Sequence, residues 1–442
     1  MREMKDSGIE WIGDVPHNWQ LVRIKVCVSR RDSGAWGEEA TGEPGDCVCI
    51  RVADMDYDRL RLKDNLPFTY RNYEEKVIES LKLADGDILI EKSGGGEKTL
   101  VGRAVMFHGT IQAVFANFME RIRCRDFVRS RFLLYILAVL YQSGYIKNYI
   151  KQTTGIQNLD ISSIFSKEYL ALPPLVAQDR IADYLDRKCS QIDAIIARQQ
   201  EVIEKLKAYK LSVITEAITK GLNPDVPMKD SGVEWIGEIP EHWNVAKMKF
   251  VAAFFNGDRS SKYPSGTDIV DTGVIFVTSN NLGNIVLNTE VDTKYITKEK
   301  YKDLGGAKLQ IDDIVFCLRG SVGKCSINKT ENEGTIASSL VAIRAEKILA
   351  DYLIFVLQCP GVTAMSTLNA IGIGSLNLSA EDISEIVIPV PSQEDTKQIA
   401  AFLEKKIGMI DKLISTKKDC IDKLTSYKKS LIYEVVTGKK EV

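Results

Sequence analysis

The feature that most constrains this chain is an internal duplication. Residues 4–25 recur as residues 228–249, with 12 identical positions among 22. Other landmarks repeat in the same order at nearly the same distance, among them residues 85–89 and residues 311–315. A single short motif can recur by chance, but landmarks spread over most of a chain indicate a repeated domain. The fold must therefore accommodate one kind of module twice.

Each module is followed by a long amphipathic segment without proline. The first is residues 178–221, and its pattern from Ile181 to Glu216 returns 218 positions later, from Ile399 to Glu434. Apolar side chains in both follow intervals of four and three residues, interrupted by polar residues at matching places. This spacing is typical of the narrow seam of a coiled coil. Because even the interruptions match, as Lys188 does with Lys406, we expect the two helices to pair with each other.

Eight apolar positions of this seam are predicted to be partner-binding: Ile181, Leu185, Ile192, Leu206, Ile399, Leu403, Ile410 and Leu424. A strict heptad also assigns to the seam Ile195, Val202 and Tyr209, with Leu413, Cys420 and Tyr427 in the second copy. Repeat symmetry further predicts a ring, in which the second helix ends beside the first module and Val435 lies near Trp11.

The chain is thus ordered as module, helix, module, helix. We predict target-binding modules at residues 1–174 and 222–391, the second including its linker, and long helices at 175–221 and 392–442. Short strand and helix signals mix inside each module, which predicts an α+β fold. Strands are expected at 46–51, 87–91, 274–278 and 313–318, with hairpin partners in 99–107 and 324–327, and helices at 132–150 and 351–358.

Composition excludes several classes of protein. The formal net charge is −2 over 442 residues, so any nucleic-acid surface must be local. Nine cysteines without a Cys-x-x-Cys pair or a secretory leader predict reduced thiols in the cytoplasm. The longest apolar run, residues 132–141, is too short to span a membrane.

No catalytic constellation emerges. Residues 93–99 resemble a phosphate-binding loop, but Glu97 stands where glycine is required and its carboxylate would repel a phosphate. The three histidines, His17, His108 and His242, share no equivalent place, and no Cys/His cluster has metal-ligand spacing. We therefore expect a binding protein that is not an enzyme and holds neither a cofactor nor a metal.

Polar and cationic turns recur in both modules. Glycines let a backbone approach a ligand closely, and Arg and Lys can bond phosphates or guanine edges. Two such loops repeat in each module, residues 91–98 with 153–158 and residues 318–324 with 371–377. The predicted DNA-binding residues are Arg30, Arg31, Trp36, Arg51, Lys92, Ser93, Gly94, Lys98, Arg103, Thr154, Gln157 and Asn158, and in the second module Arg259, Lys262, Ser279, Asn280, Asn281, Arg319, Ser321, Lys324, Ser375 and Asn377.

With its doubled MKDSGxEWIG segment, its EKSGGGEK and LRGSVGK turns and its proline-rich entry into each helix, the chain resembles the specificity subunits of type I restriction-modification enzymes. The resemblance implies two target-recognition domains that read the halves of a split, asymmetric sequence in double-stranded DNA. It also implies an antiparallel helix pair that sets the gap between the halves. The implied partners are two methyltransferase subunits, which use S-adenosylmethionine, and endonuclease subunits; no membrane is involved.

Two other functions remain open from the sequence. A related bifunctional restriction system could use the same architecture in its specificity component. A structural adaptor could bind proteins through its modules and dimerise through its helices. Only the two DNA-binding readings predict binding that depends on the base sequence.

Overall fold

The computed structural model describes residues 2–42, 44–64, 67–96, 99–153, 155–290, 292–369 and 377–442. The chain divides into two compact units, unit 1 with Met1–Gln200 and Lys418–Val442, and unit 2 with Glu201–Lys417. Each unit therefore contains one module and a portion of both long helices, α4 (Leu175–Lys220) and α9 (Gln393–Val436).

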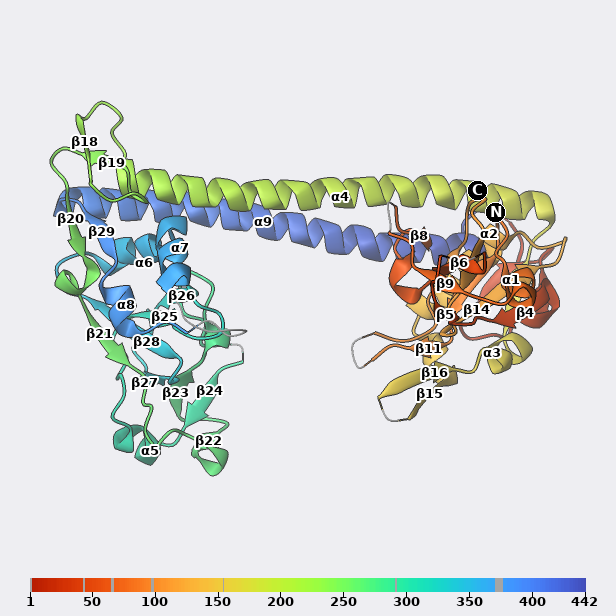
Figure 1. The fold of residues 1–442 in the computed structure, drawn as a ribbon, viewed down its shortest axis with the longest axis horizontal. Helices are drawn as coiled ribbons and strands as arrows, with labels where there is room; N and C mark the ends of the chain where they lie inside the picture. The colour runs from red at the N-terminus through yellow and green to blue at the C-terminus, as the bar shows by residue number, and fades with distance from the viewer. Residues whose placement is uncertain are drawn as a thin grey trace. The chain divides into compact units, whose positions relative to one another are not determined.

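Unit 1 contains a mixed α+β module (Figure 1). Its helices are α1 (Glu75–Leu81), α2 (Ser130–Gln142) and α3 (Ile161–Lys167). Its strands are β1 (Met4–Asp6), β2 (Asp14–Pro16), β3 (Gln20–Arg23), β4 (Val28–Ser33), β5 (Glu38–Glu39), β6 (Asp46–Ile50), β7 (Met55–Asp56), β8 (Arg61–Leu62), β9 (Tyr70–Asn72), β10 (Ile88–Glu91), β11 (Ser93–Gly94), β12 (Ala104–Met106), β13 (Ala113–Phe115), β14 (Met119–Cys124), β15 (Ile150–Thr153), β16 (Ile156–Leu159) and β17 (Tyr169–Leu172).

A six-stranded sheet in the order β4-β14-β10-β12-β8-β7 forms the centre of this module. The apolar helix α2 packs with the sheet in one buried cluster that also takes in residues of α4 and α9. A second cluster lies between the sheet β13-β6-β9-β5, helix α1 and the opposite face of the central strands. Alternate residues of β10 supply both clusters, Ile88 and Ile90 to the first and Leu89 to the second, as the two-residue period of a strand requires.

Unit 2 repeats this plan. Its helices are α5 (Lys298–Asp303), α6 (Ala350–Gln358), α7 (Pro360–Asn369) and α8 (Ala380–Ser384). Its strands are β18 (Met228–Asp230), β19 (Glu238–Pro240), β20 (Asn244–Lys247), β21 (Ala252–Asn256), β22 (Ile269–Val270), β23 (Val274–Val277), β24 (Lys294–Ile296), β25 (Ile314–Cys317), β26 (Cys325–Ile327), β27 (Gly334–Ile336), β28 (Leu340–Ala345) and β29 (Val387–Val390). The sheet β21-β28-β25-β26 corresponds to β4-β14-β10-β12 of unit 1, and the predicted hairpins β10–β12 and β25–β26 are confirmed as antiparallel pairs.

One predicted element is wrong in length. The sequence favours a single helix over residues 132–150, but α2 ends at Gln142. Gly144 adopts a left-handed conformation with φ of 75°, which ends the helix because this conformation cannot continue it. A short 3₁₀ helix, Tyr145–Tyr149, and strand β15 follow instead.

The repeated landmark before β10 and β25 is a buried ion pair. Asp87 is 3% exposed and accepts two hydrogen bonds from the Arg123 guanidinium, at 2.7 and 2.9 Å. Asp313 is fully buried and accepts the same pair of bonds from Arg344, both at 2.8 Å. Each carboxylate also caps its turn by accepting a backbone N–H, which explains why this acidic residue is present in both copies.

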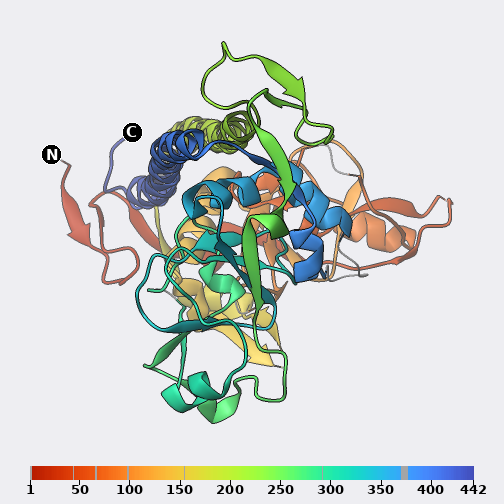
Figure 2. The same ribbon diagram turned by 90° about the vertical axis from the view of Figure 1, so that its left-hand side faces the viewer.

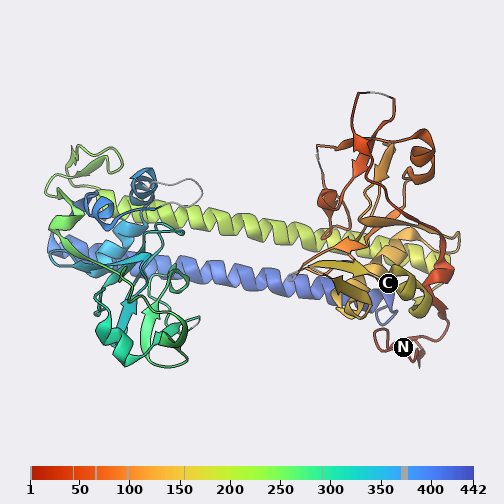
Figure 3. The same ribbon diagram turned by 60° about the horizontal axis from the view of Figure 1, so that its bottom comes forward.

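Within each unit α4 and α9 lie side by side (Figures 1 and 3). The first part of α4 pairs with the last part of α9 in unit 1, and the last part of α4 pairs with the first part of α9 in unit 2, so chain order makes the pairing antiparallel. An ion pair crosses the helices in each unit, Asp193–Lys428 at 2.7 Å in unit 1 and Lys210–Asp411 at 2.8 Å in unit 2. These pairs are related by the same 218-residue repeat.

The buried positions of the helix pair recur every eleven residues. Isoleucines with this spacing are Ile181, Ile192, Ile203 and Ile214 on α4, which are 4, 6, 1 and 0% exposed, and Ile399, Ile410, Ile421 and Ile432 on α9, of which only Ile421 is half-buried rather than buried. Eleven residues make three turns of 3.67 residues, close to the 3.6 of a straight helix, whereas a strict heptad drifts by about 20° per repeat. The heptad prediction is therefore wrong for Ile195, Tyr209, Leu413 and Tyr427, which are 46, 49, 49 and 51% exposed.

The chain ends lie close together in unit 1 (Figure 2). Val435 and Trp11 belong to one buried cluster, as the ring arrangement predicts. The Tyr433 hydroxyl donates to the Ile12 carbonyl at 3.1 Å, and a Cβ at Gly438 would lie 3.1 Å from the Trp19 ring. The end of α9 is thus packed on the β1–β2 hairpin.

Candidate nucleic-acid interface

The two recurring loops of each module meet in the structure. In unit 1, β11 pairs with β16, so that Ser93 lies opposite Asn158, and the Ser93 hydroxyl donates to Asn158 Oδ1 at 2.7 Å. In unit 2, Arg319 and Asn377 form an isolated antiparallel bridge at the equivalent place. Loops 65 and 58 residues apart in sequence thus form the same edge in both modules, but with different side chains.

In each module a glycine lets a further segment pass close to the backbone that follows one strand, β13 in unit 1 and β27 in unit 2. A Cβ at Gly34 would lie 2.2 Å from the Ala116 carbonyl oxygen, and one at Gly257 would lie 2.3 Å from that of Ala337. Only glycine permits so close a passage between two backbones. The residues two positions later, Trp36 and Arg259, consequently occupy corresponding places in the two modules.

In unit 1 the edge combines small polar groups with an aromatic ring. Lys92 Nζ donates to the Ser33 hydroxyl at 2.9 Å, and Gly94, with φ of 133°, has no atom within 4 Å of its Cβ position. The exposed Trp36 ring is covered on one face by Arg71, whose Cζ lies 4.4 Å from the ring centroid. Among the described residues Lys92 and Arg71 have no carboxylate partner, so both charges are open to a polyanion.

In unit 2 two arginines flank one turn. Arg259 Nε donates to the Ser338 carbonyl at 3.3 Å, and the backbone N–H of Leu318, next to Arg319, donates to the Ser339 carbonyl at 2.9 Å. Burial and the neighbouring Arg319 lower the pKa of the Arg259 guanidinium. Neither arginine has a carboxylate within ion-pair distance in the described part of unit 2. Two adjacent guanidinium groups without a counter-ion form a site for phosphate or for the acceptor edge of guanine.

Two more predicted residues of the 318–324 loop lie at the surface. Ser321 and Lys324 are exposed, and the Lys324 N–H closes the turn on the Ser321 carbonyl at 3.2 Å. Asn280 is also exposed and Ser279 is half-buried, both just after β23. Each of these side chains can reach a ligand.

Three predicted contacts are instead structural. Gln157 is 5% exposed, accepts the Val101 N–H at 3.0 Å and donates to the Gly96 carbonyl, so it supports the glycine-rich turn from beneath. Asn281 is 2% exposed and caps the turn after β23 by accepting the Thr278 N–H at 2.9 Å. Predicting these two as DNA contacts is wrong because their amides are already satisfied inside the module.

Arg103 is the third predicted contact with a structural role. Its guanidinium donates to the buried Glu91 carboxylate at 3.0 and 2.9 Å and lies 3.7 Å from the centroid of the Tyr57 ring. Breaking such a pair would leave Glu91, which is 2% exposed, as an unpaired buried charge. Arg103 therefore anchors the module, and its charge is balanced by Glu91.

Other predicted cations are neutralised within their units. The ion pairs are Arg30–Asp32 at 2.9 Å, Arg31–Glu120, Arg51–Asp54 at 2.8 Å and Lys262–Asp303 at 2.6 Å. These side chains keep exposed surface, but their charges are balanced. Three further predicted residues, Lys98, Thr154 and Ser375, lie outside the described residues.

The eight positions predicted to be partner-binding face the interior of the chain. Leu206 and Leu424 are half-buried and the other six are at most 6% exposed. They therefore pack α4 and α9 within the chain rather than offering a surface to another subunit.

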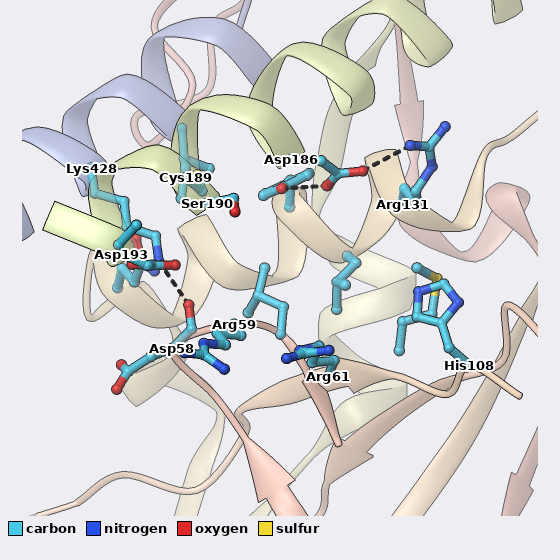
Figure 4. A pocket seen from close by; sticks show the side chains of 17 residues that line it. Asp58, Arg59, Arg61, His108, Arg131, Asp186, Cys189, Ser190, Asp193 and Lys428 are labelled. Atoms are coloured by element: carbon cyan, nitrogen blue, oxygen red, sulfur yellow. Dashed lines mark hydrogen bonds and ion pairs between the residues drawn. The ribbon is translucent and has the colours of Figure 1, made fainter. Parts of the chain in front are cut away.

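Each unit has a cavity close to these features. A cavity of about 860 Å³ in unit 2 is lined by Arg259 and Lys262 and also by Lys308, which the sequence prediction missed. Lys308 Nζ lies 3.9 Å from the centroid of the Tyr301 ring and has no carboxylate partner in the described residues, and burial lowers its pKa. A cavity of about 520 Å³ in unit 1 lies between the β7–β8 loop, α2, α4 and α9 (Figure 4).

Neither unit offers a metal centre within the residues described, where no group of three or more His, Cys, Asp and Glu side chains could hold an ion. None of the described helices is long and apolar enough to span a bilayer.

Comparison with known proteins identifies the family. The model of the type I restriction modification DNA specificity domain matches residues 19–205 and 240–423, more than half of the chain and once in each module. The chain is 26% identical to the type I restriction enzyme MjaVIII specificity subunit of Methanocaldococcus jannaschii, covering 91% of this chain and 88% of that protein. It is 23% identical to the EcoBI specificity subunit of Escherichia coli, covering 93% and 84%.

Solved structures share the fold. A chain from a structure on complex assembly and conformational transition of the type I R-M system has a TM-score of 0.70 at 14% identity, covering 96% of this chain and 98% of that one. The HsdS subunit from Thermoanaerobacter tengcongensis has a TM-score of 0.51 at 13% identity, with the same coverage. With its duplicated modules, its two long helices and its twofold match to the specificity domain, the chain belongs to the family of type I restriction-modification specificity subunits.

Proposed function

We propose that this chain gives a type I restriction-modification complex its DNA sequence specificity, each module reading one half of a split, asymmetric site in double-stranded DNA. The observation that carries the proposal is the shared edge of the two modules. Ser93 with Asn158 in one module and Arg319 with Asn377 in the other occupy equivalent places with different hydrogen-bonding chemistry. Equivalent placement lets both modules meet the duplex alike, and different side chains read different bases.

The catalytic steps then belong to the partners. Two methyltransferase subunits bind this chain and bring S-adenosylmethionine, and endonuclease subunits join through them; the complex acts on DNA in the cytoplasm. The chain itself supplies base contacts through its edge residues and phosphate contacts through its unpaired cations. Its net charge of −2 fits a subunit whose attraction for DNA is confined to these local sites.

The function can be tested by competition binding of the assembled complex at fixed salt. The split site is first identified by methylome sequencing of cells that carry the complex. Four duplexes are then compared, one with both halves intact, two with one half scrambled, and one with both halves scrambled. We expect each scrambled half to weaken binding separately. Equal binding to all four duplexes would support a protein-binding adaptor instead, and methylation by the purified chain alone would contradict the non-catalytic role.

The substitution Arg319→Ala tests whether one named residue of the second module reads its half-site. The substitution removes an exposed, unpaired guanidinium from the second module, so discrimination should fall at one half-site only, by about 1–3 kcal/mol for one bidentate base contact. If Arg319 bonds a phosphate instead, affinity falls equally for all sequences and the slope of log K against log salt becomes shallower by about one. Arg344→Ala is unsuitable as a control because Arg344 holds the buried Asp313; Lys229→Ala, in the β18–β19 hairpin, serves instead.

A further inference from the structure

One lysine joins three elements of unit 1 at the edge of the 520 Å³ cavity (Figure 4). Lys428 of α9 donates through Nζ to both carboxylate oxygens of Asp193 on α4, at 2.7 and 2.8 Å. It also donates to the backbone carbonyl of Asp58, in the loop between β7 and β8, at 2.7 Å. The Lys428 side chain is only 13% exposed, so water competes little for these bonds. The helix pair is thereby bonded directly to a loop of the module.

The residue before Asp58, Tyr57, reaches the end of β10. The Tyr57 hydroxyl donates to the Glu91 carboxylate, which also accepts two bonds from the Arg103 guanidinium. The Arg103 guanidinium stacks on the Tyr57 ring, 3.7 Å from its centroid. Burial and the Glu91 charge raise the pKa of Tyr57, so its hydroxyl stays a donor at neutral pH. Tyr57, Glu91 and Arg103 therefore form one closed, satisfied cluster.

Glu91 is the last residue of β10 and directly precedes Lys92 and Ser93, which belong to the candidate DNA edge. The loop is fixed to the central sheet as well, because the Met106 N–H donates to the Leu60 carbonyl at 2.9 Å. An unbroken series of bonds thus runs from the helix pair, through residues 57 and 58, to the base of the DNA-reading turn.

Unit 2 lacks this connection in its described residues. Lys210 is the repeat counterpart of Lys428 and bonds Asp411, but within that part of unit 2 it contacts no loop of the module. Cys317, the last residue of β25, takes the place of Glu91 and is fully buried, with a thiol where unit 1 has the carboxylate. The strands β7 and β8 are represented there by the single bridge Val286–Ile327.

We propose that the series Asp193–Lys428–Asp58–Tyr57–Glu91 positions the DNA-reading turn of the first module on the helix pair, so that Lys428 and Tyr57 determine how strictly this module reads its half-site. The inference rests on the proposed function and deepens it. Neither residue touches DNA; both act by holding residues 92–94 in place. A turn held to within a fraction of an ångström discriminates between bases, and a loosened turn does not.

The matched pair Lys428→Met and Lys210→Met tests this. Both substitutions remove one ion pair between α4 and α9 at repeat-related positions, so their effects on helix pairing should be similar. Only Lys428→Met also cuts the link to the module. In competition binding with the assembled complex we expect Lys428→Met to reduce discrimination at the first module's half-site by about tenfold, the scale of one misplaced base contact. Discrimination at the other half-site should be unchanged, and Lys210→Met should alter neither.

Tyr57→Phe provides an independent variant that keeps the ring beneath Arg103 and leaves Glu91 its two arginine bonds, so the module should still fold. It should reproduce the loss at the same half-site, and the double variant Lys428→Met/Tyr57→Phe should lose no more than the larger single loss, because both cut one series. If Lys428→Met prevents assembly, Tyr57→Phe alone decides the question.

Three results would overturn the inference: equal behaviour of Lys428→Met and Lys210→Met, loss at both half-sites, or full discrimination in Tyr57→Phe. Failure of the underlying function is distinguishable from these, because in that case the unsubstituted complex would already bind scrambled and intact sites equally.

Discussion

Arg344 and Arg319 belong to the same module, yet their surroundings give them opposite roles. Arg344 bonds a carboxylate that is fully buried, so its charge is part of the fold. Arg319 is exposed beside Arg259 and has no carboxylate partner among the described residues, so its charge is available to a ligand. Unit 2 contains three arginines, Arg259, Arg319 and Arg344. Among the described residues, only Arg344 is paired with a carboxylate.

This difference predicts opposite effects on stability. Arg344→Leu should lower the free energy of unfolding by about 3 kcal/mol, because it leaves the Asp313 carboxylate buried without its partner. Arg319→Leu should change it by less than about 0.5 kcal/mol, because it removes no internal bond. Urea denaturation of the full chain, followed by circular dichroism, measures both. Equal losses in the two variants would show that Arg319 has a structural partner.

In the long helices, the repeat length of the sequence pattern determines which residues are buried. An eleven-residue repeat places Ile203 in the interior, at 1% exposed, where the heptad placed its neighbour Val202. The same repeat turns Ile195 outward, at 46% exposed. Nearly straight helices keep this seam aligned, whereas heptads would require left-handed supercoiling.

The same truncation at two positions distinguishes the eleven-residue repeat from the heptad. Ile203→Ala should destabilise the chain by about 2–4 kcal/mol, since it opens a cavity in a buried seam. Ile195→Ala should cost less than about 0.5 kcal/mol, since an exposed side chain loses little on truncation and alanine favours the helix. Thermal unfolding followed at 222 nm provides the comparison. A large loss of stability for Ile195→Ala would instead support a heptad seam.

For the whole molecule, the repeat length determines which insertions the helix pair can accept. Helix α4 connects the two modules along the chain, and α9 follows the second module and ends in unit 1, so the length of both helices should set the gap between the half-sites. Two eleven-residue repeats inserted in each helix, after Gln200 and after Lys417, keep the seam in register and add about 33 Å. This length is close to one turn of DNA, about 34–36 Å or 10–10.5 base pairs. The modules would then meet the same face of a longer site.

We therefore expect the double-repeat variant to prefer a site whose gap is about 10 base pairs longer. A variant with one added repeat per helix, about 16 Å, is the control. It shifts the modules by about half a turn of DNA, so it should bind no gap as strongly as the parent does. Competition binding with duplexes of graded gap length measures both. Undiminished preference of either variant for the original gap would show that the helices do not set the spacing.

Much of this molecule could be predicted from the sequence alone. The duplication, the two long helices, the α+β modules and the family follow from local patterns and from their recurrence at a fixed distance. The two loops that meet at Ser93 and Asn158 could be named because both recur. Such features are visible in sequence because neighbouring residues produce them: helix periodicity, strand alternation and turn-forming glycines act over a few positions.

Only the tertiary structure decided which of the recurring cations are free. In the sequence Arg103 follows a glycine-rich turn and Arg319 begins one, but folding places Glu91 against the first and no described carboxylate against the second. Lys428 likewise gains its role from Asp193, 235 residues away, and from Asp58, 370 residues away. The physical reason is the short range of these interactions. Whether a charge is neutralised depends on which group the folded chain brings within about 4 Å of it, and residues distant in sequence supply that group.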